Sequence, residues 1–214
     1  MVDELPARSE EFLEKHGIAS LRPAQEKAVA AGVLSGANVL VCTPTASGKT
    51  LVAELAMLEV VASQKKALYV VPLKALGSEK YRSFSQRLGC RVALSVSDFD
   101  SSDSRLGEFD VIVSTAEKLD SLLRHQAAWL SRVGLVVVDE IHLLNDSSRG
   151  PTLEVLLTML RRLINPQVIG LSATIGNPQE LADWLGAQLV LDDWRPVRLD
   201  KGVFVSSQIE FPEE

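Results

Sequence analysis

The sequence predicts an α/β fold in which helices cover both faces of a doubly wound, mostly parallel sheet. Short apolar runs rich in β-branched residues alternate with longer segments of helical periodicity. The apolar runs are nearly continuous, as expected for parallel strands that are buried on both faces. With 214 residues, the chain is long enough for one such domain with a substantial core.

The predicted elements alternate along most of the chain. Strands are expected at 38–42, 67–71, 92–94, 111–113, 135–138 and 168–171. Helices are expected at 23–34, 48–62, 78–88, 116–124, 152–163 and 178–184. Pro23 and Pro178 suit the first turn of a helix, where a missing amide hydrogen leaves no hydrogen bond unmade. Residues 97–104 are polar and rich in turn formers, which predicts a surface loop.

Composition narrows the class of protein. Hydrophobic residues make up 46% of the chain and charged residues 23%, which is typical of globular proteins. The acidic segment 1–4 does not resemble a signal peptide, and no apolar run approaches the roughly 18 residues of a membrane span, so we expect a cytoplasmic protein without a membrane partner. Cys42 and Cys90 are too few for a disulfide framework or a zinc site.

The net charge of −6 argues against a broad basic surface for nucleic acid. If the protein binds a nucleic-acid strand, only a few loops of this chain, or parts of the protein outside it, can hold that strand. Charge alone therefore does not identify the function.

A phosphate-binding loop is predicted directly after the first strand. Small residues there let successive backbone amides converge, and the helix that follows adds its positive N-terminal end. Lys49 supplies a mobile charge for the phosphates, and Thr50 offers a hydroxyl for a magnesium ion. Thr43 occupies the position of the first glycine of the strict P-loop pattern. The predicted phosphate-binding residues are Thr45, Ala46, Ser47, Gly48, Lys49 and Thr50.

An acidic pair follows the predicted strand 135–138. Adjacent carboxylates at the end of a buried strand are costly unless a cation or a proton neutralises them. We therefore expect Asp139 to hold Mg²⁺ and Glu140 to orient and deprotonate an attacking water. Ligands of such sheets bind beyond the carboxyl ends of the strands, so the acidic pair and the phosphate loop are expected to meet across neighbouring strands. Lys49, Asp139 and Glu140 are the predicted catalytic residues.

These motifs resemble those of superfamily-two helicases almost from end to end. Their phosphate loop matches residues 44–50, their acidic box matches 139–142, and their third motif matches 172–174. Residues 72–76 and 115–118 resemble two segments that contact a nucleic-acid strand, and Arg22, Pro23 and Gln25 resemble a glutamine motif that senses adenine. The resemblance implies a RecA-like P-loop NTPase domain.

Four further segments are more specific. Residues 121–125, 149–154, 175–178 and 193–197 resemble archaeal DNA-repair helicases of the Hjm type, which are relatives of the HELQ helicases. The resemblance runs from about Leu21 to Phe204 and departs from the family at Pro151 and at residues 97–100. It implies an ATP-dependent 3′–5′ DNA helicase or translocase that acts in DNA repair or replication restart.

The resemblance also implies roles for particular side chains. Gln25 would hydrogen-bond adenine, and ATP and Mg²⁺ would be the cofactors. Each role has a simpler alternative, in which the glutamine is only a polar residue of an amphipathic helix, the lysines are ordinary surface lysines, and the residues at 172–174 form a helix cap. The implied strand contacts are Lys74, Thr115 and Lys118, and the implied coupling residues are His142, Ser172 and Thr174.

The expected organisation is a lead-in at 1–20, a first RecA-like domain at 21–200, and at 201–214 the start of a connection to a second RecA-like domain that this chain lacks. Expected partners are single-stranded or branched DNA, that second domain and further domains of the parent protein. The isolated domain is expected to bind ATP, to hydrolyse it poorly and not to unwind duplexes. The alternatives are an RNA helicase, a nucleotide-driven transporter or switch, and a non-catalytic interaction domain.

Overall fold

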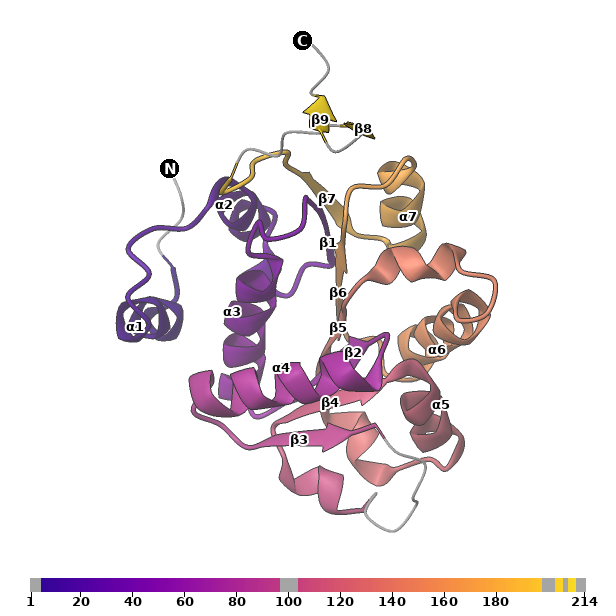
Figure 1. Cartoon of the computed structure of the whole chain (residues 1–214). Helices are drawn as coiled ribbons and strands as arrows, with labels where there is room; N and C mark the ends of the chain where they lie inside the picture. Colours follow the sequence, from indigo (N-terminus) through magenta and orange to yellow (C-terminus); the bar gives the residue numbers. More distant parts are fainter. Residues whose placement is uncertain (1–4, 97–103, 198–202, 206–207, 211–214) are drawn as a thin grey trace.

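A seven-stranded parallel sheet forms the centre of the molecule, with strand order β3-β4-β2-β5-β6-β1-β7 (Figure 1). The computed structural model describes residues 5–96, 104–197, 203–205 and 208–210. The predicted α/β class and parallel sheet are confirmed. The strands are β1 Val39–Cys42, β2 Lys66–Val71, β3 Val92–Ser95, β4 Val111–Thr115, β5 Val133–Val138, β6 Gln167–Ser172 and β7 Gln188–Leu191.

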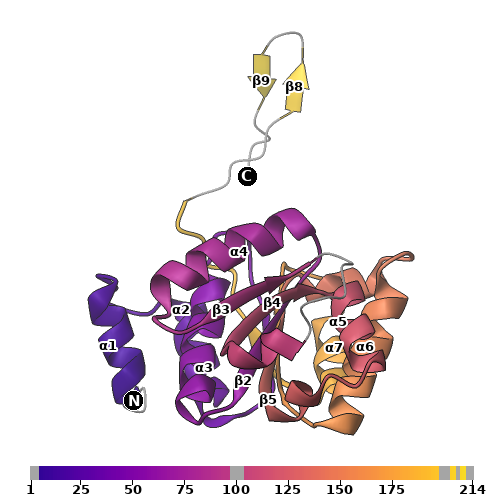
Figure 2. The same cartoon turned by 90° about the horizontal axis from the view of Figure 1, so that it is seen from below.

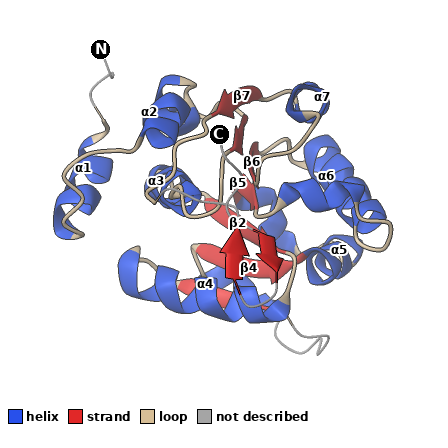
Figure 3. Cartoon of the chain, turned by 45° about the horizontal axis from the view of Figure 1, so that its top comes forward, coloured by secondary structure: helices blue, strands red, loops and turns tan. Residues whose placement is uncertain are grey.

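Helices cover both faces of this sheet (Figures 1, 2 and 3). One face carries α1 Ala7–Lys15, α2 Pro23–Ala30, α3 Lys49–Ala62 and α4 Lys74–Arg87. The other carries α5 Ala116–Arg124, α6 Gly150–Leu163 and α7 Pro178–Leu185. Short 3₁₀ helices lie at η1 Val33–Ser35, η3 Ser104–Glu108, η4 Ala128–Arg132 and η5 Ile141–Asn145. Strands β8 Val203–Val205 and β9 Gln208–Glu210 pair antiparallel in a separate sheet.

The core consists of two layers, one on each face of the sheet. Alternate residues of a strand point to opposite faces, so Val39 and Val41 of β1 pack in the layer under α3, whereas Leu40 packs in the layer under α6 and α7. All three side chains are fully buried. Burial on both sides explains why the strand sequences are continuously apolar.

The prediction from sequence misplaced the ends of two helices and missed two elements that bury few residues. The predicted helix 78–88 begins instead at Lys74, and the predicted helix 23–34 ends at Ala30. β7 was missed: it is a short edge strand in which only Val190 is buried, so it lacks the long buried run that marks the central strands. α1, in the predicted lead-in, was missed because only a few of its residues, including Phe12 and Leu13, are buried. Of the predicted surface loop 97–104, residues 97–103 lie outside the described residues, as does the family departure at 97–100.

The ends of four adjacent strands position the functional residues. β2, β5, β6 and β1 are consecutive in the sheet, and all four run in the same direction. The phosphate loop follows β1 and the acidic pair follows β5, but β6 lies between these two strands. The expectation that they occupy neighbouring strands was therefore wrong, since strand order is not encoded in local sequence patterns.

Among the described helices, none has both the length and the apolar character needed to cross a membrane.

Candidate functional site

The phosphate loop is held in shape by its own residues. Ala46 and Gly48 adopt positive φ angles of 67° and 92°, which turn the chain sharply between β1 and α3. The Thr43 hydroxyl lies 2.7 Å from the Ser47 hydroxyl and is fully buried. The threonine at the first-glycine position therefore closes the loop through a side-chain hydrogen bond. The Lys49 ammonium donates to the carbonyl oxygens of Thr43 at 2.7 Å and Pro44 at 3.2 Å.

Gln25 connects the start of α2 to this loop. Its Nε2 donates to the Gly48 carbonyl at 3.0 Å, and its Oε1 accepts from the Arg22 amide at 2.8 Å. The Arg22 guanidinium donates to the Ala46 carbonyl at 2.9 Å and lies over the Trp194 ring at 5.2 Å from its centroid. A side chain at Gly48 would approach Gln25 Nε2 at 2.5 Å, so glycine is required there by contact as well as by φ. The glutamine amide is thus already engaged on both sides.

The acidic pair sits where β5 ends. Asp139 Oδ1 accepts from the Glu140 amide at 3.1 Å, and Asp139 Oδ2 accepts from the Tyr69 hydroxyl at 2.8 Å. Glu140 has a φ of 52°, a left-handed conformation that non-glycine residues adopt rarely and that often marks functional sites. His142 Nδ1 lies 3.3 Å from Glu140 Oε2, so the predicted coupling histidine touches the predicted base.

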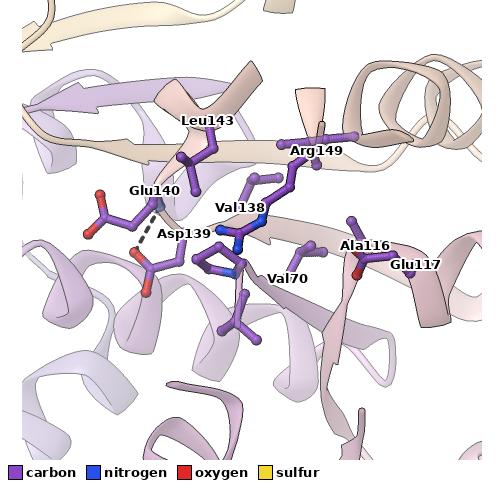
Figure 4. Close-up of a pocket in the computed structure, with 11 residues that line it drawn as sticks. Val70, Ala116, Glu117, Val138, Asp139, Glu140, Leu143 and Arg149 are labelled. Atoms are coloured by element: carbon purple, nitrogen blue, oxygen red, sulfur yellow. Dashed lines mark hydrogen bonds between the residues drawn. The ribbon is translucent and has the colours of Figure 1, made fainter. Parts of the chain in front are cut away.

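Figure 4 shows a small pocket beside the acidic pair, lined by residues from β2, β5, α5 and α6 and by Arg149. The carboxylates of Asp139 and Glu140 point away from Glu117, which lies across the pocket. Their oxygens are therefore directed away from the α5 side.

Lys80 of α4 was not singled out from the sequence, yet it reaches both predicted metal ligands. Its ammonium donates to the Thr50 hydroxyl at 2.9 Å and lies 3.8 Å from Asp139 Oδ2. A cation thus already bridges the hydroxyl and the carboxylate, which shows that this oxygen pair suits a positive ion. In the sequence, nothing distinguishes Lys80 from any other lysine in a predicted helix.

The donor set also fits a magnesium ion that is shared with phosphates. No group of three or more His, Cys, Asp and Glu side chains suited to a metal occurs within the described ranges. Mg²⁺ is commonly held by only one or two protein oxygens together with phosphate oxygens and water. Thr50 and Asp139 match that pattern.

Burial controls the charge states around the site. It lowers the pKa of Lys49, an effect that the nearby Glu140 and Asp139 carboxylates oppose. Burial raises the pKa of Tyr69 well above its usual value, and the neighbouring Asp139 adds to this shift. The tyrosine therefore remains a hydroxyl donor to Asp139. Burial also raises the pKa of the Cys42 thiol, and the neighbouring Ser172 hydroxyl and Lys49 only partly offset it.

The third motif lies between the two halves of the site. Ser172 is the last residue of β6, pairs with Cys42 across the sheet and is fully buried. The Thr43 amide donates to its carbonyl at 3.2 Å, so β6 is tied directly to the phosphate loop. Thr174 follows β6 and is exposed. The structure thus places Ser172 at the loop and Thr174 at the surface.

The residues implied as strand contacts are not gathered into one cluster. Lys74 is exposed at the first residue of α4. Thr115 caps α5, where its hydroxyl accepts from the Lys118 amide at 3.4 Å. Both Thr115 and Lys118 are 5% exposed, so neither side chain stands open on the surface. Of the three, Lys74 alone presents its side chain to solvent.

Comparisons with known proteins identify a family and several relatives of this chain. The DEAD/DEAH box helicase family matches residues 22–181. "ATP-dependent DNA helicase Hel308" of Methanocaldococcus jannaschii is 52% identical over 211 residues, which cover 94% of this chain and 18% of that protein. The protein of the same name from Pyrococcus abyssi is 53% identical over 197 residues, which cover 91% of this chain and 27% of that protein. The chain thus spans under a third of either relative.

Two solved structures share the fold. The DUF1998 helicase MrfA bound to DNA superposes with a TM-score of 0.75 at 27% identity, covering 90% of this chain and 30% of that one. The Mycobacterium smegmatis helicase Lhr bound to ssDNA and AMP-PNP gives a TM-score of 0.71 at 30% identity, covering 88% of this chain and 27% of that one.

Proposed function

Since the chain belongs to the DEAD/DEAH box helicase family, we propose that it is the ATP-binding motor domain of an ATP-dependent DNA helicase or translocase. The observation that carries the proposal is the convergence of Lys49, Thr50, Asp139 and Glu140 at the ends of β1 and β5. Their types and positions supply a cation for phosphates, two oxygens for a metal and a base for water.

Each residue has a proposed task in ATP hydrolysis. Lys49 exchanges its two loop carbonyls for phosphate oxygens, while the amides of residues 45–50 cradle the phosphates. Thr50 and Asp139 would hold Mg²⁺, which neutralises charge on the phosphates when bound. Glu140 takes the proton of the attacking water, and His142 holds the Glu140 carboxylate in position.

Adenine recognition by Gln25 is a finer proposal. Its two hydrogen bonds leave one amide hydrogen and one lone pair of Oε1, enough for the paired acceptor and donor of adenine. Binding of the base would then be sensed at Gly48, because the same amide contacts the phosphate loop.

The nucleic-acid partner is proposed to be single-stranded or branched DNA. Both relatives are named as DNA helicases, and MrfA has been solved with DNA and Lhr with ssDNA. We propose that Lys74 contacts strand phosphates directly, and that Thr115 and Lys118 shape the start of α5 that faces the strand. Translocation is proposed to run 3′ to 5′, in the cytoplasm, during DNA repair or replication restart.

Productive turnover is proposed to require a second RecA-like domain and further domains of a longer protein. The relatives are several times longer than the stretch that this chain matches. A charged residue supplied from another domain accelerates phosphoryl transfer by about 10³ to 10⁵ in related chemistry. The domain described here would then bind ATP and hydrolyse it slowly, and Ser172, Thr174 and His142 would couple the nucleotide to the strand.

The test compares ATP turnover by this chain with turnover by the full-length protein, each with and without single-stranded DNA. We expect slow, DNA-independent turnover by the chain and fast, DNA-stimulated turnover by the full-length protein. DNA-stimulated turnover by the chain alone at the rate of the full-length protein would contradict the proposal that productive turnover requires further domains.

A parallel titration of the full-length protein with DNA and RNA strands of equal length tests the choice of nucleic acid. Stronger stimulation by RNA would favour the alternative of an RNA helicase.

A further inference from the structure

Lys80 occupies the place that the proposed function assigns to a metal ion. Its ammonium lies within hydrogen-bonding distance of the Thr50 hydroxyl and 3.8 Å from Asp139 Oδ2. These are the two oxygens proposed to hold Mg²⁺. The side chains of Lys80 and Asp139 are only 14% and 10% exposed, so solvent does little to screen the contact.

The position of Lys80 is fixed by the packing of α4. Phe84, one turn further along, is fully buried and meets Tyr69 edge to face with ring centroids 4.9 Å apart. Gly77, almost one turn earlier, lets α4 approach β2 closely, since a Cβ there would lie 3.2 Å from Val71. Lys80 therefore reaches the oxygen pair from a backbone that is held on both sides of it.

An ammonium and a divalent cation cannot both occupy this oxygen pair. Two positive charges a few ångströms apart repel strongly where water is mostly excluded. The ammonium has space to leave, because Lys80 also lines an open pocket together with Gln25, Glu54 and Ser83. A rotation of the lysine side chain into this pocket, with loss of its hydrogen bond to Thr50, would free the oxygen pair.

We propose that Lys80 is an internal counter-ion that neutralises the Thr50–Asp139 pair and is displaced when Mg²⁺ arrives with a nucleotide. This inference rests on the proposed function, because the pair is a metal site only if the chain binds a magnesium nucleotide. The lysine keeps Asp139 in place beforehand, and its displacement raises the Mg²⁺ concentration that binding requires. Lys80 is accordingly a positioning residue.

The displaced lysine also links two surfaces. α4 begins at Lys74, the proposed strand contact, and Lys80 lies less than two helical turns further along the same rigid helix. A cation exchange at Lys80 would therefore act on the helix that begins with the proposed strand contact.

The test uses Lys80→Met, with Arg82→Met as the matched control because Arg82 is an exposed cation of the same helix. Binding of a fluorescent ATP analogue is titrated with Mg²⁺, and thermal unfolding is followed without nucleotide in a chelator. For Lys80→Met we expect half-saturation at an Mg²⁺ concentration about ten-fold lower, because a charge-assisted hydrogen bond no longer has to be broken. The unfolding midpoint without metal should fall by about 2 to 4 °C, and Arg82→Met should match the wild type in both measurements.

Two outcomes would overturn the inference, and a second variant covers the case in which the first does not fold. The first is an unchanged or higher Mg²⁺ requirement in Lys80→Met while the wild type binds the analogue normally. This result would contradict the cation exchange but leave the proposed function standing, and Lys80 would then be a phosphate ligand or a structural residue. If Lys80→Met does not fold, Lys80→Gln keeps a hydrogen-bond donor without the charge, and the same shift is required of it. Failure of the wild type to bind the analogue at any Mg²⁺ concentration would instead contradict the proposed function, and the exchange with it.

Discussion

The ends of β1 and β5 differ from the starts of α4 and α5 in how far their polar side chains are already organised. At the strand ends, Lys49 contacts its own loop, and Tyr69 and Lys80 contact Asp139. At the helix starts, Lys74 of α4 is exposed, whereas Lys118 of α5 is buried. The proposed nucleotide site is therefore assembled within this domain, whereas the proposed strand site offers one exposed lysine.

This difference between the two sites indicates which side chains of this domain contribute most to ligand binding. A preassembled site loses little side-chain entropy when its ligand binds, so its individual residues should matter greatly. A surface with few cations on a chain of net charge −6 should bind a strand weakly and depend on other parts of the protein. Substitutions on the two sides should therefore differ in size.

Lys49→Ala tests the preassembled side and should have the largest effect. ATP affinity, measured by calorimetry, should fall about ten-fold or more, because a charge-assisted phosphate contact contributes roughly 1.5 to 3 kcal/mol. Folding stability should be maintained, since burial already disfavours the charged form of this lysine. Lys15→Ala, on the exposed surface of α1, is the control. Unchanged ATP affinity would remove the phosphate loop from the proposed site.

Gln25→Ala separates a structural role from a base-sensing role. Loss of its two hydrogen bonds to Gly48 and Arg22 should weaken nucleotide binding about five- to ten-fold, at roughly 1 kcal/mol per hydrogen bond at most. If adenine is recognised, affinity for ATP should fall more than affinity for GTP. The neighbouring exposed Glu26→Ala should change neither. Equal losses for both nucleotides would leave only the structural role.

The sequence revealed residues whose chemistry is visible in local patterns. The phosphate loop and the acidic pair each follow an apolar run directly, so a single rule about strand ends located Lys49 and Asp139. Tyr69 was missed because it lies inside an apolar run and reads as a core residue, although its hydroxyl holds Asp139. Lys80 was missed because a lysine on a helix is usually a surface residue.

Strand order and side-chain burial also could not be predicted from the sequence. That β6 lies between β1 and β5 follows from long-range pairing, which no local pattern encodes. Lys118 matches a strand-contacting motif in sequence, yet its helix turns it inward beside the buried Leu119 and Leu122. A motif therefore identified the segment, but only the packing shows which of its side chains are accessible.

Tyr69→Phe tests whether the acidic end is held by its neighbours. The change removes one hydrogen bond to a largely buried carboxylate and should lower the free energy of unfolding by about 1 to 2 kcal/mol, as measured by urea denaturation. Tyr81→Phe, on a partly exposed tyrosine of α4, is the matched control. The Mg²⁺ requirement for nucleotide binding should shift only a few-fold, because Thr50 is unchanged. A stability equal to that of the control would mean that Asp139 does not depend on Tyr69.

The smallest effect is expected from Lys74→Ala, which tests the strand side. If Lys74 neutralises a single phosphate, the plot of log affinity for single-stranded DNA against log salt should become shallower by about 0.7, with affinity falling a few-fold at low salt. Folding should be unaffected because the side chain is exposed. Lys118→Met should behave in the opposite way, lowering stability through its buried position while leaving the salt slope unchanged. Fluorescence anisotropy at several salt concentrations, with unfolding measured in parallel, distinguishes the two. The opposite result would be a reduced salt slope for Lys118→Met and an unchanged slope for Lys74→Ala. It would show that Lys118 turns outward to contact the strand when DNA binds. The contrast between the two regions would then hold only for the domain in the absence of nucleic acid.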